Sequence, residues 1–302
     1  MMSGEYLDTS RKRVIEAGRA GSGHHALLIE GNRGSGRYTT AKLTACAMLN
    51  CGKDELIVKG IHPDVITIKA GKIDKIREMK SDAAVLPNEA ERKVYIIRDA
   101  QNMTVEAQNA FLKLLEEPPK HVAFILTADN RAKLLETILS RVAVFGIDNF
   151  SVRECADILR KKLGKSEGIE EASELFEGNI GLAEEALKDG KLIEDAKHGL
   201  ELIDSVYAPY GWDTLRIVSM YEKDKERFKA FLDMLRMQCV KIAADKALGR
   251  ENEARRVRKE IKAEDLLKIA EIAESTKKDI EMNGNFPLVI TMFCAKIRKV
   301  KG

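Results

Sequence analysis

Residues 26–49 read ALLIEGNRGSGRYTTAKLTACAML, and this stretch decides the fold of the N-terminal half. The apolar run Ala26–Glu30 predicts a buried strand, and the apolar-rich run Thr39–Asn50 predicts a helix. A glycine-rich turn, residues 31–36, separates them. A phosphate-binding loop occupies this place in a strand–turn–helix unit, because glycines let backbone N–H groups converge and the helix N-terminus adds partial positive charge.

The alternation of strand and helix patterns continues as far as residue 148. Short apolar runs predict further strands at residues 65–68, 94–97, 122–126 and 142–145. Helical patterns lie between them at 73–79, from 104 onward and at 133–139. Strands that alternate with helices indicate a mostly parallel sheet with ligand-binding loops at its carboxyl edge. We therefore predict an α/β domain over residues 1–148.

After Phe150 the strand signal ends. Residues 151–190 predict three short helices, which are interrupted at Gly164–Gly168 and Gly178–Gly181, and longer helices with apolar faces follow from about residue 200. We therefore predict a small helical lid domain over residues 149–198 and a separate all-α domain over residues 199–302.

Composition excludes several classes of protein. The chain has 302 residues, enough for two or three domains. It has no run near the about 20 apolar residues of a membrane span, and its first residues lack the apolar core of a secretory signal. Five cysteines without a framework spacing indicate reduced thiols. A net charge of +3 does not by itself indicate nucleic-acid binding. We expect a cytoplasmic protein with no membrane partner.

The glycine-rich turn departs from the complete phosphate-loop motif, which continues with Lys and then Ser or Thr. Here Arg37 and Tyr38 occupy those positions. Arginine can pair with phosphate, but its planar fork differs from the point charge of lysine. Tyrosine cannot readily replace the small hydroxyl that binds magnesium. We predict a degenerate nucleotide-binding loop without ATP hydrolysis, and a plain glycine turn is the alternative. The residues of this degenerate nucleotide-binding loop are Gly31, Gly34, Ser35, Gly36 and Arg37.

The end of the third predicted strand should carry the acidic residues that hold magnesium and orient the attacking water. Residues 95–101 read YIIRDAQ, so Arg98 stands where an aspartate is needed and only Asp99 remains. A shift by one residue would make Asp99 the metal ligand, but Ala100 would then follow and cannot polarise water. In either alignment, one of the two acidic residues is missing. The other interpretation of Asp99 is an exposed aspartate at a strand end.

Residues 93–119, KVYIIRDAQNMTVEAQNAFLKLLEEPP, closely resemble bacterial clamp-loader subunits of DNA polymerase III, and among them the delta-prime type. Four further segments agree in order and spacing, and the resemblance covers about residues 23–183. These segments are HALL at 25–28, GIHPD at 60–64, IDKIR at 73–77 and TILSR at 137–141.

The resemblance implies a P-loop AAA+ domain, a helical lid and an all-α C-terminal collar domain that assembles into a ring. The implied partners are gamma/tau-like ATPase and delta subunits, the sliding clamp and, through the complex, primed DNA. In the family, the arginine of a Ser-Arg-Cys motif reaches ATP on the neighbouring subunit. Ser140 and Arg141 match this motif and Val142 replaces the cysteine. A surface or ion-paired arginine at a helix end is the alternative interpretation of Arg141.

Other family elements are altered. Asp129 occupies a sensor position that is usually Thr or Asn, and the lid's sensor arginine, expected near Gly181, is absent. Many relatives carry a four-cysteine zinc module, but here Cys46 and Cys51 have only His62 as a nearby third ligand. We therefore predict no metal, and ordinary buried or half-buried thiols.

These departures favour a subunit that offers Arg141 to a neighbour while hydrolysing nothing itself. It would be a non-enzymatic part of the DNA polymerase III holoenzyme, a nucleotidyltransferase complex. We expect no required cofactor, and passive binding of ATP or ADP stays open. The alternatives are an active clamp-loader or other AAA+ ATPase with an atypical loop, and a non-replicative AAA+ scaffold. Apolar residues near the C-terminus predict that the collar mediates assembly: Leu288, Met292, Phe293 and Ile297.

Overall fold

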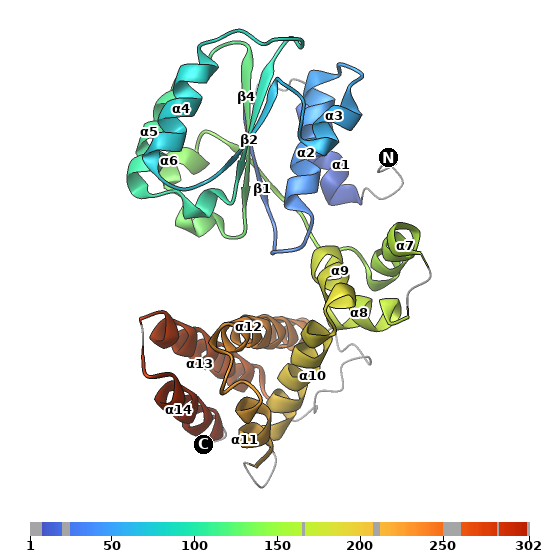
Figure 1. The fold of residues 1–302 in the computed structure, drawn as a ribbon, viewed down its shortest axis with the longest axis vertical. Coiled ribbons are helices and arrows are strands. Elements are labelled where there is room, and N and C mark those ends of the chain that lie inside the picture. Colours follow the sequence, from blue (N-terminus) through green and yellow to red (C-terminus); the bar gives the residue numbers. More distant parts are fainter. Residues whose placement is uncertain are drawn as a thin grey trace. The chain divides into compact units, whose positions relative to one another are not determined.

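The computed structural model describes residues 8–19, 25–164, 167–207, 212–249, 261–282 and 284–300. The chain divides into two compact units, Met1–Glu184 and Glu185–Gly302 (Figure 1). The first unit holds an α/β domain followed by short helices, and the second is entirely helical where it is described.

A parallel sheet of five strands forms the centre of the first unit, in the order β2-β3-β4-β1-β5. All of the predicted strands are present, which confirms an α/β domain with a parallel sheet. Their carboxyl ends lie at one edge, where the loops that follow β1, β3 and β4 meet. The strands are β1 (Ala26–Glu30), β2 (Val65–Lys69), β3 (Lys93–Arg98), β4 (Val122–Ala128) and β5 (Ala143–Gly146).

Helices cover both faces of the sheet (Figure 1). One face carries α1 (Thr9–Arg19), α2 (Arg37–Leu49) and α3 (Asp54–Lys59), and the other carries α4 (Ile73–Ala83), α5 (Val105–Glu116) and α6 (Glu136–Leu139). Side chains of a strand alternate between these faces. Tyr95 and Ile97 of β3 pack on the α4–α5 side, whereas Val94 and Ile96 pack on the α1–α2 side.

The helix predicted over residues 133–139 is shorter in the structure. Residues Arg131–Lys133 form a 3-10 turn, and α6 begins only at Glu136. The backbone N–H of Leu135 donates a hydrogen bond to the side-chain oxygen of Gln108 on α5, 2.8 Å away. This bond from a neighbouring helix interrupts the helical pattern. Helices α1 and α3 were not predicted.

Three short helices follow the sheet, as predicted: α7 (Val152–Leu163), α8 (Ile169–Leu175) and α9 (Ile180–Lys188). We call them the lid. Ser151 starts α7 with a capping box, in which its hydroxyl accepts from the N–H of Glu154 and the Glu154 carboxylate accepts from the N–H of Ser151. The lid belongs to the first compact unit as far as residue 184.

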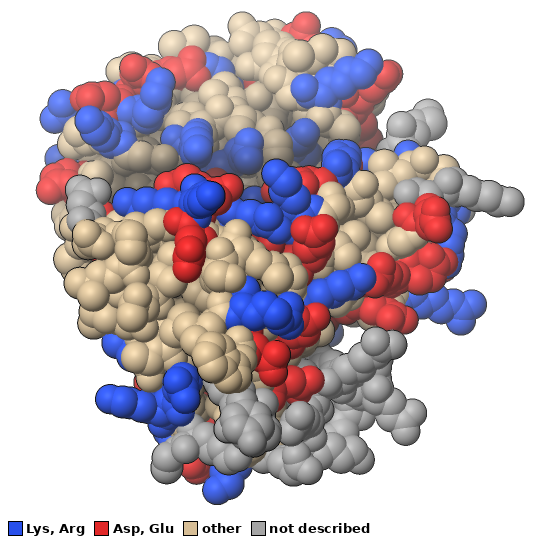
Figure 2. Space-filling model, turned by 60° about the horizontal axis from the view of Figure 1, so that its bottom comes forward, with Lys and Arg blue, Asp and Glu red and all other residues tan. Residues whose placement is uncertain are grey.

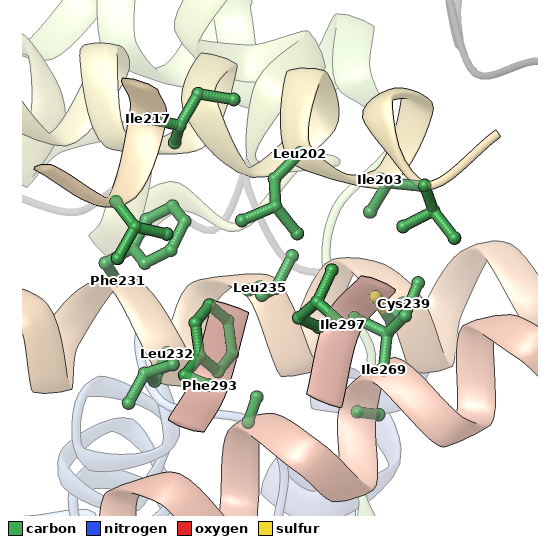
Figure 3. Close-up of a cluster of buried hydrophobic side chains, with 14 of the residues drawn as sticks. Leu202, Ile203, Ile217, Phe231, Leu232, Leu235, Cys239, Ile269, Phe293 and Ile297 are labelled. Atoms are coloured by element: carbon green, nitrogen blue, oxygen red, sulfur yellow. The ribbon is translucent and has the colours of Figure 1, made fainter. Parts of the chain in front are cut away.

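The second unit, which we call the collar, consists of α10 (Gly190–Ser205), α11 (Trp212–Ser219), α12 (Lys225–Ala247), α13 (Ala263–Glu281) and α14 (Phe286–Arg298). Its core joins side chains of all these helices; Figure 3 shows Leu202 and Ile217 facing Phe231, Leu235 and Phe293. The predicted boundary between residues 198 and 199 falls inside α10, a continuous helix. The two compact units meet between 184 and 185, inside α9, and Leu202 and Ile203 of α10 lie in the collar core.

Two residues proposed for collar assembly are internal. Phe293 and Ile297 are fully buried in the collar's own core, whereas Leu288 is 58% and Met292 46% exposed. The helical period explains the difference, because the inward and outward residues lie on opposite sides of α14.

The surface is mixed in charge. Lys and Arg side chains lie beside Asp and Glu side chains across the face in Figure 2, in keeping with the near-zero net charge. Among the helices that the structure describes, none is both long enough and apolar enough to cross a membrane.

Candidate nucleotide-binding and interface sites

The glycine-rich turn, residues 31–36, joins β1 to α2, and we call it the glycine loop. Gly34 has φ +83° and Gly36 has φ +89°, a left-handed region that favours glycine. Gly36 stands directly before α2, where the N–H groups of the first helical turn have no partner within the helix. The local backbone is therefore that expected of a phosphate loop.

A buried arginine that the sequence analysis did not identify holds the backbone of this loop by a hydrogen bond. Arg11 of α1 is only 3% exposed, and its guanidinium donates to the backbone oxygens of Ser35 and, at 2.9 Å, Asp148. It also pairs with Asp8, whose carboxylate caps the start of α1 by accepting from the N–H of Arg11. In the sequence, Asp8 is a residue type that commonly begins a helix, and this could have predicted the start of α1.

Arg37 pairs with the remaining acidic residue of the degenerate motif. Its Nη2 lies 3.5 Å from Oδ1 of Asp99, and 11% of its side chain is exposed. Burial lowers the pKa of Arg37, and the nearby carboxylates of Asp129 and Asp99 oppose that shift. The structure thus brings three predicted site residues together. The carboxylates of Asp99 and Asp129 place negative charge near the Arg37 guanidinium, but its buried Nη1 has no hydrogen-bond partner among the described residues.

A second substituted pair lies beside the first. The guanidinium of Arg98 lies over the ring of Tyr38, 4.2 Å from its centroid, and the Lys42 ammonium lies 4.5 Å from the same centroid. The Tyr38 hydroxyl is 3.3 Å from the hydroxyl of Thr67 on β2. A cation–π stack therefore occupies the motif positions of the magnesium-binding hydroxyl and the first acid.

The residues at and after the end of β3 form a hydrogen-bonded turn. Asp99 adopts a left-handed conformation, φ +54°, and its N–H donates to the hydroxyl of Thr127 at 3.1 Å. Ala100 is fully buried and begins a 3-10 turn, Ala100–Asn102. Arg98 is the last residue of β3, in register with Lys69 of β2. The register places arginine at the strand end and Asp99 in the turn.

The lid contacts the glycine loop directly. The N–H of Gly181 donates to the backbone oxygen of Gly34 at 2.9 Å, and the side-chain amide of Asn179 donates to the backbone oxygen of Arg33 at 2.8 Å. The position expected for a sensor arginine is therefore in backbone contact with the loop.

Arg141 lies at an exposed site between α6 and β5. Its guanidinium donates to the backbone oxygen of Thr137 at 2.9 Å and to the hydroxyl of Ser140 at 3.1 Å. It also forms an ion pair with Glu116 at the end of α5, with 3.0 Å between Nη2 and Oε1. The side chain remains 36% exposed. Ser140 thus positions Arg141 directly, and Glu116 is a partner that the sequence did not predict.

The two cysteines at the C-terminal end of α2 are thiols, and Cys46 is buried while Cys51 is half-buried. Burial raises the pKa of Cys46 to about 12, and Sγ of Cys51 lies 3.5 Å from Nε2 of His62. His62 also accepts from the N–H of Asp64 through Nδ1 at 3.1 Å. Within the described ranges, no cluster of three or more His, Cys, Asp or Glu side chains could hold a metal ion.

Comparisons with known proteins agree with this architecture. Residues 9–151 match the family described as "DNA polymerase III, delta subunit". The chain is 33% identical over 202 residues to the DNA polymerase III gamma subunit of Buchnera aphidicola (Schizaphis graminum), which covers 62% of this chain and 52% of that protein. It is 34% identical over 134 residues to the delta-prime subunit of Bacillus subtilis, covering 39% of this chain and 40% of that protein.

A solved structure shares the fold. The DNA polymerase III gamma subunit-related protein of Thermotoga maritima superposes with a TM-score of 0.52 at 22% identity, over 98% of this chain and 100% of that one. This chain spans about half the length of the first curated relatives that it matches. Gamma and delta-prime relatives match at nearly the same identity, so the similarity identifies the family and not the subunit. By these matches, residues 9–151 of the chain belong to the DNA polymerase III clamp-loader family of AAA+ proteins.

Proposed function

We propose that this chain is a delta-prime-like clamp-loader subunit that hydrolyses no ATP and offers Arg141 to a neighbouring ATPase subunit. One observation carries the first part. The magnesium-binding hydroxyl and first acid are replaced by the stacked pair Tyr38–Arg98, and the motif lysine by Arg37 paired with Asp99. Each substituted arginine therefore contacts a side chain of the same site, although the buried Nη1 of Arg37 has no hydrogen-bond partner among the described residues.

The chemistry of these pairs opposes hydrolysis. Magnesium prefers carboxylate and hydroxyl oxygens, but this site presents the guanidinium groups of Arg98 and Arg37. Of the two nearby carboxylates, Asp99 is paired with Arg37, and Asp129 also lies close to the Arg37 charge. Ala100 supplies no group to orient or polarise water. The subunit therefore requires no cofactor for its role.

Arg141 carries the second part of the proposal. A guanidinium stabilises charge on a transferred phosphoryl group, and one supplied from a neighbouring chain can complete that neighbour's site. Arg141 is partly exposed, and Ser140 and Thr137 hold two of its bonds. It can exchange the exposed Glu116 carboxylate for a phosphate without losing its other contacts.

The assembly is proposed by analogy with the family. The partners are gamma/tau-like ATPase and delta subunits, and the complex acts on the sliding clamp and primed DNA in the cytoplasm. Co-purification with the cognate ATPase and delta subunits tests this assembly. A chain that binds neither subunit would favour the alternative of a non-replicative scaffold.

ATP turnover by the purified chain tests the inactive site. We expect no turnover above that of a Gly36→Asp variant, which adds a carboxylate to the glycine loop and strains its left-handed backbone. Robust turnover that Gly36→Asp abolishes would instead establish an active ATPase with an atypical loop.

A further inference from the structure

The first turn of α9 lies on the glycine loop through a set of short, complementary bonds. Gly181 donates to the backbone oxygen of Gly34, and Asn179 donates to that of Arg33. The side-chain oxygen of Asn179 accepts from the N–H of Leu182 at 3.1 Å. Asn179 is 1% exposed, and its bond to the N–H of Leu182 is buried. Buried polar bonds of this kind are costly to break because water cannot readily replace them.

Glycine is required on both sides of this contact. A Cβ on Gly181 would lie 2.6 Å from Cα and 2.7 Å from the backbone oxygen of Gly34. A Cβ on Gly34 would lie 2.2 Å from Oδ1 of Asn179. Any side chain at position 181, an arginine included, would force the two backbones apart. The absent sensor arginine therefore permits the direct contact.

The connection between the sheet and the lid is fixed as well. The N–H of Phe150 donates to the backbone oxygen of Gly178 at 3.2 Å. Arg11 donates to the backbone oxygen of Asp148, and its guanidinium lies 3.9 Å from the centre of the Phe150 ring. Both the loop contact and the connecting segment thus resist rotation of the lid.

We infer that Gly34, Asn179 and Gly181 form a latch that holds the lid closed on the glycine loop without a bound nucleotide. A ligand shifts a conformational equilibrium only through a difference in affinity for the two states. Because direct bonds between the lid and the loop already stabilise the closed conformation, a nucleotide can shift the lid equilibrium only slightly further. The inference rests on the proposed function and explains how a non-hydrolysing subunit keeps one lid position.

Hydrogen–deuterium exchange of the full chain tests the latch, read by mass spectrometry in residues 31–38 and 178–184. We expect slow exchange in both segments, unchanged by millimolar MgATP or MgADP. Gly181→Ala and Asn179→Ala should each speed local exchange by about tenfold or more, because the added Cβ at position 181 forces the two backbones apart and Asn179→Ala removes the side-chain hydrogen bonds. Gly190→Ala is the matched control, because a Cβ there meets no atom within 4 Å.

Two results would overturn the latch. One is protection of these segments that appears only when nucleotide is added. The other is wild-type exchange in both variants while circular dichroism shows them folded. If a variant unfolds, the comparison of the wild-type chain with and without nucleotide decides the question. A latch that fails in a chain without ATPase activity leaves the proposed function standing, and ATP turnover by a latched chain contradicts only the proposed function.

Discussion

Arg141 can be tested with its own ion-pair partner as the control. We expect Arg141→Ala to lower the DNA-stimulated ATPase of the reconstituted complex and to leave thermal unfolding of this subunit nearly unchanged. Loss of an arginine supplied in trans costs about 10³–10⁵ in rate at one site, so the loss for a ring with several sites should be partial. The exposed pair with Glu116 contributes only about 0–1 kcal/mol to stability. Arg141→Lys should rescue little, because lysine lacks the planar fork.

Glu116→Gln separates the two interpretations of Arg141. It removes the ion pair at 3.0 Å but keeps the guanidinium. If Arg141 acts on a neighbour's phosphate, Glu116→Gln should retain most of the ATPase that Arg141→Ala loses. Equal loss in both variants, with a matching drop in unfolding temperature, would favour a structural ion pair. Unchanged ATPase in Arg141→Ala with unchanged assembly would remove Arg141 from the mechanism.

Asp64 predicts a pH dependence of stability. Its buried carboxylate accepts from the backbone N–H groups of Asn88, Glu89 and Ala90 at 2.6–2.8 Å. Burial alone would raise the pKa of Asp64, but these hydrogen bonds outweigh it and lower the pKa below its ordinary value. The carboxylate therefore stabilises the fold above the unfolded pKa of about 3.9, and this contribution is lost as the pH falls through the lower folded value.

Urea unfolding of the wild type and Asp64→Asn over a pH series measures this contribution. We expect a destabilisation of about 2–3 kcal/mol at pH 7, typical of hydrogen bonds to a charged group. The difference should shrink as the pH falls from about 5 toward 2, where the wild-type carboxyl is protonated as well. A difference that stays constant over the series would show that the charge of Asp64 is not what stabilises this loop.

At the scale of one element, the outward side of α14 is the candidate surface for assembly. Leu288 and Met292 lie one helical turn apart and are both exposed, whereas their neighbours Val289 and Phe293 are buried. Exposed apolar side chains on adjacent turns are typical of a protein–protein contact. We expect Leu288→Lys together with Met292→Lys to weaken co-purification with the ATPase and delta subunits.

Met282→Lys is the control for this surface, since Met282 is 76% exposed at the end of α13. Neither variant should shift thermal unfolding by more than a few degrees, because the changed side chains are not in the core. Normal co-purification of the α14 variant would place the contact on another element. Equal weakening by Met282→Lys would point to a general effect of added charge.

At the scale of the whole molecule, the break between the last lid helix and the first collar helix predicts where the chain can be divided. Helix α9 ends at Lys188 and α10 begins at Gly190, so a chain that ends at residue 189 keeps every element of the sheet and the lid. We expect this fragment to fold, by circular dichroism and thermal unfolding, and to lose co-purification with the other subunits. A cut near residue 200 would instead divide α10, whose later residues Leu202 and Ile203 belong to the collar core. A fragment 1–189 that still assembled would show that the collar is dispensable.

The order of strands and helices, the parallel sheet, the lid and the helical collar could be read from periodicity and turn residues. The altered positions Arg37, Tyr38 and Arg98 could also be read, because each is a change of residue type within a recognisable local motif, whereas the missing arginine near Gly181 followed only from the resemblance to the clamp-loader family. Short elements were less accessible: α3 spans only Asp54–Lys59, too few turns for a clear apolar period. The start of α6 also escaped prediction, since Gln108 on another helix determines it.

The sequence by itself determined which functional groups are present and which are missing, because that information is local. Only the tertiary structure decided which groups meet. Arg37 and Asp99 are separated by 62 positions, and Arg33 and Asn179 by 146, yet each pair is in hydrogen-bond contact. Crossovers between parallel strands bring the first pair to one sheet edge, and packing of the lid on the loop brings the second together. Local periodicity carries no signal for either contact. The absence of the sensor arginine is therefore visible in the sequence, but the backbone contact between Gly181 and Gly34 that takes its place is visible only in the structure.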